Sequence, residues 1–330
     1  MDTLQLLELP IILYLQTLGS WVTEIAKAIT FLGNEDFYFI IMPALFWCLD
    51  FRLGIYVGMM LILSNSMNTI LKLAFHSPRP YWINPDLTIS ITETSFGLPS
   101  GHAQNAASLW GLLTTKLHRK YHLFLLLIIF LIGLSRVILG VHFISDVILG
   151  WLVGTLLLMI FIKLEKSIID WISGQTAIKL HFLSALISLI LILIPVLIIT
   201  SLKTWEIPQF WLDNAFRSNP NAHVDPLNPS GIISLAGVWL GMSNGLLLLY
   251  NHFGEFDVSG TWTNKALRYV VGIIGIIIVW YGLGTVFPRT NDLLGYSLRY
   301  IRYSLAGIWI SYIAPVLFSR LRLGGFKHKS

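Results

Sequence analysis

The chain has 330 residues, of which 55% are hydrophobic and 12% charged, and its formal net charge is +5. Soluble domains carry about 25% charged residues and about 45–50% apolar ones. So little charge excludes a soluble enzyme and a disordered chain, because a single soluble core stops growing near about 250–300 residues. Cys48 is the only cysteine in the sequence, which excludes a disulfide scaffold and a cysteine-based metal site. The composition therefore indicates a membrane protein.

Apolar runs long enough to cross a membrane follow one another along most of the chain. Residues 9–33 are apolar but contain Gln16, Glu24 and Lys27, which predicts an amphipathic or weakly inserted helix. Because an open sheet cannot satisfy its backbone in hydrocarbon, the predicted fold class is all-α, a polytopic bundle of membrane helices. Stronger runs predict eight or nine crossings. They are residues 36–50, 53–75, 100–116, 123–141, 144–163, 180–201, 230–251, 267–287 and 303–318.

Basic residues between the apolar runs set the expected orientation. Three clusters fall on one face if the crossings alternate, and an excess of Lys and Arg marks that face as cytoplasmic. These clusters are Lys116 to Lys120, Lys163 with Lys166, and Arg320 to Lys329. The opposite face holds the remaining loops, in which Arg289 and Arg299 depart from the rule. The positive net charge is thus assigned to helix orientation, and nucleic acid is not an expected partner.

Ionisable side chains gather in three short segments that this topology places at the non-cytoplasmic edge. The segments are KLAFHSPRP (72–80), PSGH (99–102) and SRVILGVHFISD (135–146). Ionisable groups at a membrane edge are costly and are therefore candidates for function. Each segment alone has a structural explanation: cations that reach to the interface, a helix start, or a packed histidine. Their occurrence together on one face predicts a receptor for a phosphoryl group.

Five of these residues have the chemistry of a phosphate cradle. The forked donors of arginine match the oxygens of a phosphoryl group, and a lysine adds a point charge. Backbone N–H groups at a helix start bind an anion, and a glycine there permits a close approach. The five residues are Lys72, Arg79, Ser100, Gly101 and Arg136.

Three further residues have the chemistry of nucleophilic catalysis. His142 and Asp146 are spaced i, i+4 and so share one face of a helix. The carboxylate can accept the Nδ1–H of the imidazole, which leaves Nε2 as a nucleophile. His102 comes from another helix and can deliver a proton to the leaving oxygen. No cluster of Asp and Glu has the pattern of a metal site, so the sequence predicts neither a metal nor a cofactor.

The three segments together resemble the signature of the type 2 phosphatidic acid phosphatase (PAP2) superfamily. The resemblance covers roughly residues 20–165 and implies a metal-independent phosphatase with a six-helix core and a covalent phosphohistidine. It implies that His142 is the nucleophile, Asp146 its orienting acid and His102 the general acid, with the other five residues as the cradle. The matching residues are Lys72-x6-Arg79-Pro80, Pro99-Ser100-Gly101-His102 and Ser135-Arg136-x5-His142-x3-Asp146.

Two parts of the chain are predicted from this resemblance. Residues 1–165 form a PAP2-like core, in which 1–35 are an amphipathic or first membrane helix. Residues 166–330 form a C-terminal transmembrane extension to which no chemistry is assigned. Within the extension, residues 202–229 predict an ordered interfacial loop, whose charged side chains are expected to be solvated. These are Arg217, His223 and Asp225.

The membrane setting favours an amphiphilic substrate, either a lipid phosphate monoester or a polyprenyl diphosphate cleaved at its anhydride bond. Two alternatives stay open: a lipid phosphotransferase with the same site, and a non-catalytic transporter or scaffold that binds anions. The expected partners are the lipid phosphate and the surrounding membrane lipids, and a homo-oligomer stays open. The expected location is a bacterial plasma membrane, with the site on the non-cytoplasmic side.

Overall fold

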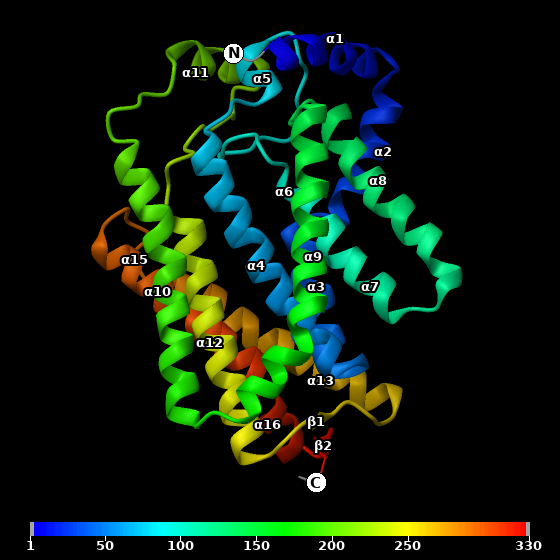
Figure 1. Ribbon diagram of the computed structural model, residues 1–330, viewed down its shortest axis with the longest axis vertical. Coiled ribbons are helices and arrows are strands. Elements are labelled where there is room, and N and C mark those ends of the chain that lie inside the picture. The colour runs from blue at the N-terminus through cyan, green and yellow to red at the C-terminus, as the bar shows by residue number, and fades with distance from the viewer. Residues whose placement is uncertain (1–2, 328–330) are drawn as a thin grey trace. The chain divides into compact units, whose positions relative to one another are not determined.

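The computed structural model describes residues 3–327, whose regular secondary structure is almost entirely helical (Figure 1). The all-α prediction is confirmed. The first third of the chain ends in a long loop over residues 84–100. Its helices are α1 (Thr3–Thr17), α2 (Ser20–Phe31), α3 (Glu35–Ala44), the π-helical η1 (Leu45–Leu49), α4 (Phe51–Phe75) and α5 (Pro80–Ile83).

The middle of the chain carries two of the three motif segments. The PSGH segment opens a helical stretch that contains a π-helical turn, and the third segment forms the tight turn between two long helices. These helices are α6 (Gly101–Asn105), η2 (Ala106–Trp110), α7 (Gly111–Lys116), the 3-10 helix η3 (Arg119–Tyr121), α8 (His122–Ile138) and α9 (Ile144–Ser173).

The remainder of the chain is a further series of long helices with one short strand pair, in which β1 (Phe256–Asp257) and β2 (Gly325–Phe326) are antiparallel. Its helices are α10 (Ala177–Ser201), α11 (Gln209–Ser218), α12 (Ser230–His252), α13 (Trp262–Ile277), η4 (Ile278–Gly282), α14 (Leu283–Val286), α15 (Leu293–Ile308), η5 (Trp309–Ile313) and α16 (Ala314–Arg320).

Seven helical stretches among the described residues are long and apolar enough to cross a membrane, or up to eight if α1 and α2 form one span. The sequence predicted eight or nine. The difference lies in the runs 36–50 and 100–116, whose helices have only 15 and 16 residues, from Glu35 to Leu49 and from Gly101 to Lys116. At 1.5 Å per residue, 16 residues reach about 24 Å, which is short of a hydrocarbon core of roughly 30 Å.

The helices α1 and α2, which cover the predicted 9–33 region, are bent by 107° with respect to each other. Gly19 lies between them with φ 109°, a backbone conformation that glycine adopts readily and other residues do not. The polar residues of this region bind the loops near the motif segments. The Glu8 carboxylate accepts hydrogen bonds from the backbone N–H and hydroxyl of Ser145 at the start of α9. The α1 helix therefore braces these loops.

The described residues divide into two compact units. Unit 1 comprises the residues up to Tyr38 together with Leu63–Lys163 and Pro195–Asn228. Unit 2 comprises Phe39–Ile62, Leu164–Ile194 and the residues from Pro229 onward. Each unit contains several segments of the chain, and α9 runs through residue 165 without a break. A boundary between two functional parts at residue 165 stays a prediction.

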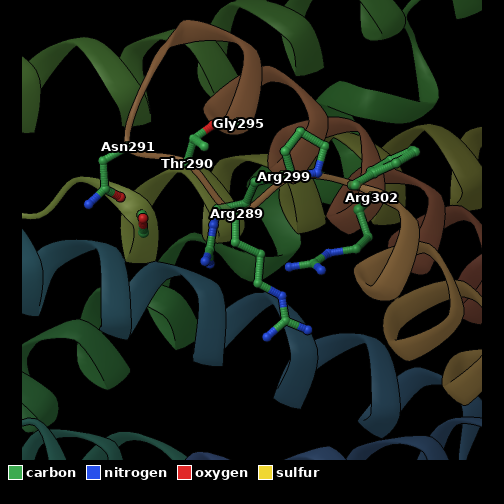
Figure 2. A pocket seen from close by; sticks show the side chains of 9 residues that line it. Arg289, Thr290, Asn291, Gly295, Arg299 and Arg302 are labelled. Carbon is green, nitrogen blue, oxygen red and sulfur yellow. The ribbon is translucent and has the colours of Figure 1, made fainter.

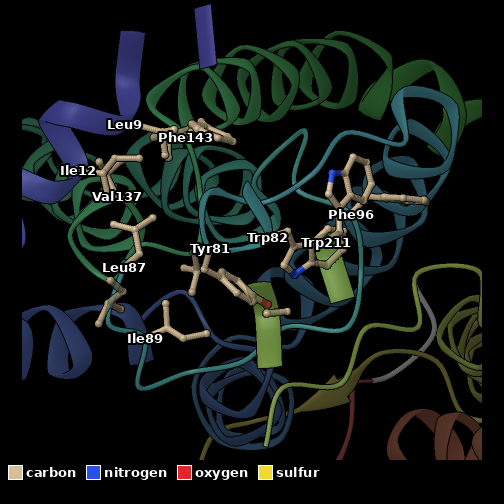
Figure 3. Packing of buried hydrophobic residues seen from close by; sticks show 14 of the residues in the cluster. Leu9, Ile12, Tyr81, Trp82, Leu87, Ile89, Phe96, Val137, Phe143 and Trp211 are labelled. Carbon is tan, nitrogen blue, oxygen red and sulfur yellow. The ribbon is translucent and has the colours of Figure 1, made fainter. Parts of the chain in front are cut away.

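The hydrophobic core of unit 1 lies beside the motif segments (Figure 3). Trp82 of α5 is fully buried, and its ring lies 5.7 Å from that of Trp211 in α11. Asn214 donates to the carbonyl of Trp82, which fixes α11 on α5. The segment 202–229 thus contains a packed helix and is more than the predicted interfacial loop. The other labelled members of this core are Leu9, Ile12, Tyr81, Leu87, Ile89, Phe96, Val137 and Phe143.

The central contact of unit 2 is between α12 and α15. A Cβ atom on Gly241 of α12 would lie 1.9 Å from the carbonyl oxygen of Ser304 on α15. This close approach requires glycine, because any side chain would collide with the backbone of the neighbouring helix. A hydrogen bond of 2.7 Å between the hydroxyls of Ser188 and Tyr300 joins α10 to α15 within the same unit.

Candidate active site

The three motif segments meet inside unit 1. Arg79 precedes α5, Ser100 precedes α6, and His142 lies in the turn between α8 and α9. The backbone N–H of Ser100 donates to the carbonyl of Asp146 at 2.9 Å, which joins the second segment to the third. The structure therefore brings the predicted site residues together.

The histidine and the acid of the third segment form a hydrogen-bonded pair. His142 Nδ1 lies 3.1 Å from Oδ2 of Asp146, and both side chains are 1% exposed. The same carboxylate oxygen accepts the backbone N–H of Phe143 at 3.0 Å, which fixes its position. On the other side of the ring, Nη1 of Arg79 lies 3.2 Å from Nε2 of His142. With Nδ1 donating to the acid, Nε2 carries the lone pair and accepts from the guanidinium.

The pKa of His142 follows from this environment. Burial, and next the guanidinium of Arg79, lower the pKa of the imidazole well below its ordinary value. A neutral ring is the form that has a lone pair on Nε2, and a neutral ring is what a nucleophilic histidine requires.

Arg79 is held rigidly by the backbone around it. Its side chain is fully buried, and Nε donates to the carbonyl of Ser95 at 2.7 Å. Nη1 donates to the carbonyl of Val141 at 2.9 Å, and Nη2 donates to that of Phe96 at 3.1 Å. The nearby Lys72 is also buried, and its Nζ donates to the hydroxyl of Ser95 at 2.8 Å. The first motif segment and the long loop thus place two cations side by side.

Glu93 of the long loop contacts the candidate site, and sequence reasoning missed it. Its carboxylate accepts a short charged hydrogen bond from Nη2 of Arg136, and its other oxygen lies 3.8 Å from Nη2 of Arg79. Burial would raise the pKa of Glu93, but the two guanidinium groups outweigh burial and hold that pKa well below its usual value. Arg136 also donates to the hydroxyl of Thr30 in α2 at 2.9 Å. A protein carboxylate therefore lies between the two predicted cradle arginines.

The second segment forms the start of a helix, as its sequence predicts. The Ser100 hydroxyl is the N-cap of α6 and accepts the backbone N–H of Ala103 at 3.4 Å. A Cβ atom on Gly101 would lie 3.0 Å from Oδ1 of Asn68, so a larger residue would crowd α4 there. His102 is half-buried, and its imidazole forms no hydrogen bond with any residue of the described range 3–327, although its backbone carbonyl accepts the N–H of Ala106. Its imidazole is the one member of the predicted set without a fixed partner among those residues.

A buried network of amides behind the PSGH segment was also missed. Asn68 of α4 donates to the carbonyl of Pro99 at 3.2 Å and to Oε1 of Gln104 at 2.9 Å. Gln104 in turn donates to the carbonyl of Ser64 at 2.7 Å. Polar side chains in an apolar stretch are usually hydrogen-bonded. The run SNSMN at 64–68 is the signal that could have revealed this network.

The fold and the site define a multi-pass, all-helical membrane protein with a buried His–Asp pair beside a cluster of cations. Comparison with known protein families gives its family. Residues 53–169 match the model of the PAP2 superfamily, and residues 233–327 match that of the PAP2 superfamily phosphatase transmembrane extension. The chain belongs to the PAP2 superfamily.

Two curated relatives and one solved structure are similar to parts of the chain. The chain is 29% identical over 161 residues to phosphatidylglycerophosphatase B of Bacillus subtilis. This alignment covers 45% of the chain and 77% of the Bacillus protein. It is 26% identical over 322 residues to lipid phosphate phosphatase delta of Arabidopsis thaliana. This alignment covers 89% of the chain and 71% of the Arabidopsis protein. The crystal structure of a transmembrane PAP2 type phosphatidylglycerolphosphate phosphatase from Bacillus subtilis is 25% identical, with a TM-score of 0.44, and covers 51% of this chain and 89% of that one.

Proposed function

We propose that this protein is a membrane phosphatase that hydrolyses a lipid phosphate through a phosphohistidine on His142. The observation that carries the proposal is the place of the Glu93 carboxylate, between the guanidinium groups of Arg79 and Arg136. The same Arg79 contacts Nε2 of His142. An anion that replaces the carboxylate would therefore lie beside the nucleophile. A phosphoryl group suits this position, because its oxygens match the forked donors of two arginines.

In the first step, Nε2 of His142 attacks phosphorus and the bond from phosphorus to the lipid oxygen breaks. Asp146 keeps the proton on Nδ1 and stabilises the cationic ring as the new bond forms. The guanidinium of Arg79 leaves Nε2 and binds the phosphoryl oxygens, whose negative charge grows in the transition state. Burial, and next the guanidinium of Arg136, lower the pKa of His102 well below its ordinary value, and the negative charge of the bound phosphate favours its protonated form. Protonated in this way, His102 gives its proton to the leaving lipid oxygen.

In the second step, water attacks the phosphohistidine. His102, now neutral, takes a proton from the water, and the bond from phosphorus to Nε2 breaks. Inorganic phosphate leaves, and both histidines return to their starting protonation states. The cradle of Lys72, Arg79 and Arg136 stabilises both transition states, so the proposed reaction needs no metal.

The substrate that we propose is a lipid phosphate monoester, with a polyprenyl diphosphate as the second candidate. The long apolar helices keep the protein in the membrane, where an amphiphile can leave its tails while its phosphate enters the site. The names of two relatives, a phosphatidylglycerophosphatase and a lipid phosphate phosphatase, support this class. We further propose a bacterial plasma membrane, because one relative comes from Bacillus subtilis. The non-cytoplasmic side is proposed for the site, because Lys116 and Lys163 lie toward the far ends of the helical stretches that begin at the site.

The test is phosphate release by the purified full-length protein from a panel of lipids. The panel holds phosphatidylglycerol phosphate, phosphatidic acid, a sphingoid-base phosphate and a polyprenyl diphosphate. We expect His142→Ala to lose on the order of 10⁴-fold or more in kcat, as when a nucleophile is removed from other enzymes. The matched control is His223→Ala, because His223 is exposed. Full phosphate release by His142→Ala from every lipid would refute the proposal.

Two additions to this assay separate the alternatives. An acceptor lipid is added, because a phosphotransferase would make a new phospholipid at the expense of free phosphate. EDTA is added in a parallel reaction, in which we expect unchanged activity. A strict requirement for Mg²⁺ would contradict the proposed metal-independent mechanism, and an anion transporter or scaffold would release no phosphate at all.

A further inference from the structure

A second group of cations lies in unit 2, around the start of α15. Arg289 belongs to the loop after α14, whereas Arg299 and Arg302 lie one turn apart on α15 and share a helical face. Together with Thr290 and Asn291 they line a pocket (Figure 2). Its volume, including the part open to solvent, is about 310 Å³.

Within the part of the chain that the structure describes, no carboxylate balances the charge of this pocket. Among residues 3–327, none of the Asp and Glu side chains forms an ion pair with Arg289, Arg299 or Arg302. The nearby Asp292 is engaged elsewhere, since it accepts the hydroxyl of Thr290 and the backbone N–H at the start of α15. Like charges held together at low dielectric are costly unless an anion joins them.

Arg302 is the member that points most strongly to a ligand. Its side chain is 7% exposed, and its Nε donates to no acceptor in the described part of the chain. The guanidinium lies 5.2 Å from the ring centroid of Tyr303. A Cβ atom on Gly284 would lie 2.5 Å from Nη1, so glycine leaves room for the guanidinium at this place. A buried polar group in a native protein normally has a hydrogen-bond partner.

The other two arginines have few partners of their own. Nη1 of Arg299 donates to the hydroxyl of Ser234 at 3.1 Å, and Nε of Arg289 donates to the carbonyl of Gly284 at 3.2 Å. Each of these contacts uses one of the five N–H donors of a guanidinium. Three arginines in one pocket therefore offer more donors than the protein itself uses.

The position of the pocket suggests which anion it takes. Arg299 and Arg302 lie within the stretch Leu293–Arg320, which is long and apolar enough to cross a membrane. Arginines within such a stretch are costly and are retained for function. Phosphate is the anion that best matches several forked guanidinium donors. We propose that Arg289, Arg299 and Arg302 bind a phosphate group, supplied by the headgroup of an anionic phospholipid or by free phosphate.

The site is separate from the proposed reaction, since none of its residues belongs to the catalytic cradle. Its test is therefore a binding measurement on the full-length protein in neutral detergent. The unfolding temperature is followed during titration with phosphatidylglycerol, phosphatidylcholine or inorganic phosphate. We expect Arg302→Gln to raise the half-maximal concentration of phosphatidylglycerol roughly tenfold or more, since it removes charged hydrogen bonds. The half-maximal concentration for Arg302→Lys is expected to lie between those for the wild type and Arg302→Gln.

Control variants keep the result interpretable. If Arg302→Gln does not fold, the double variant of the less buried Arg289 and Arg299, each changed to Gln, takes its place. The matched control changes Arg320 and Arg322 to Gln, two exposed arginines at and just beyond the other end of the same stretch. If the arginine variants weaken the binding of phosphatidylglycerol alone, the ligand is a lipid headgroup. If they weaken the binding of inorganic phosphate, the ligand is free phosphate. Equal half-maximal concentrations for all variants with every probe would overturn the proposal.

Discussion

Arginines gather at two places in this protein, and the two groups differ in what neutralises them. In the candidate active site, Arg79 is fixed by backbone carbonyls, and the Glu93 carboxylate lies between it and Arg136. In the pocket of unit 2, the three arginines share no carboxylate within residues 3–327, and Arg302 lies against the ring of Tyr303. The first group contains its own anion, and the second offers its charge to an anion from outside.

The difference shows two ways to keep a cation cluster ready for phosphate. A cluster with an internal carboxylate is assembled before the substrate arrives, but the substrate must displace that carboxylate. A cluster without one gains the full interaction when an anion binds, but it carries an unbalanced charge until then. The first arrangement suits an enzyme site, from which phosphate must leave after each turnover. The second suits a site that keeps its anion bound.

The largest effect in this comparison is expected in kcat/KM, which should depend on one arginine group and not on the other. Arg136→Ala removes donors from the transition state and should lower kcat/KM by about 10²–10³-fold, the usual cost of losing a preorganised donor. Arg299→Ala should leave kcat/KM for the same lipid phosphate within about twofold, because it touches no reacting group. Steady-state kinetics on both purified variants check this. A comparable loss in both would mean that the pocket of unit 2 takes part in turnover.

A smaller effect is expected behind the PSGH segment. Asn68→Leu leaves Oε1 of Gln104 and the carbonyl of Pro99 without a donor, at a cost of about 1–3 kcal/mol in the free energy of unfolding. The helix start would lose its brace, so kcat should fall roughly tenfold while KM changes little. Denaturation and kinetics on the same preparation test both parts. Unchanged kcat in a destabilised variant would show that the network is purely structural.

Unlike the two substitutions above, Glu93→Gln should strengthen the binding of an anion at the candidate active site. The variant removes the charge that competes for Arg79 and Arg136, so the inhibition constant of vanadate should decrease about tenfold, close to one charged hydrogen bond. Asp213→Gln is the matched control, because Asp213 is exposed on α11. Weaker vanadate inhibition in Glu93→Gln would instead mean that the carboxylate is needed to position the arginines.

The smallest effect is the pH dependence of stability. The folded-state pKa of Glu93 is lowered, so its ion pairs stabilise the fold above the unfolded pKa near about 4.3 and are lost as pH falls below that value. Wild type should therefore exceed Glu93→Gln in stability by about 1 kcal/mol between about pH 5 and 8, and the gap should close below about pH 4. Unfolding measured across this range checks the prediction, which a gap that widens in acid would contradict.

The candidate site residues, which the structure brings together, could be selected from the sequence because they are exceptional in it. In a chain with 12% charged residues, cations at a membrane edge such as Lys72 and Arg79 stand out, and the spacing of His142 and Asp146 follows from helix geometry. Glu93 could not be predicted in the same way. It lies in a loop without periodicity, and only the folded loop brings its carboxylate to Arg136.

Helix length and long-range packing explain the other differences. The apolar run 100–116 resembles a span in its hydropathy, but its helical stretch, which begins after the turn at Pro99, has only 16 residues. The segment 202–229 is rich in Pro, Asn and Trp, which indicates a loop, yet Trp211 and Asn214 attach a helix to α5. Such contacts join residues more than a hundred positions apart, and a local pattern carries no information about them.

The attachment of α11 has a consequence for how this protein can be divided. Trp82 packs against Trp211, and the carbonyl of Thr94, next to Glu93, accepts the backbone N–H of Asp225. A chain cut after residue 165 would keep every motif residue but would expose the indole of Trp82 and release the loop that carries Glu93. We therefore expect any shortened form with an intact site to need residues 195–228 as well. The three motif segments and the segment that completes their fold must therefore stay together in any shortened form of this protein.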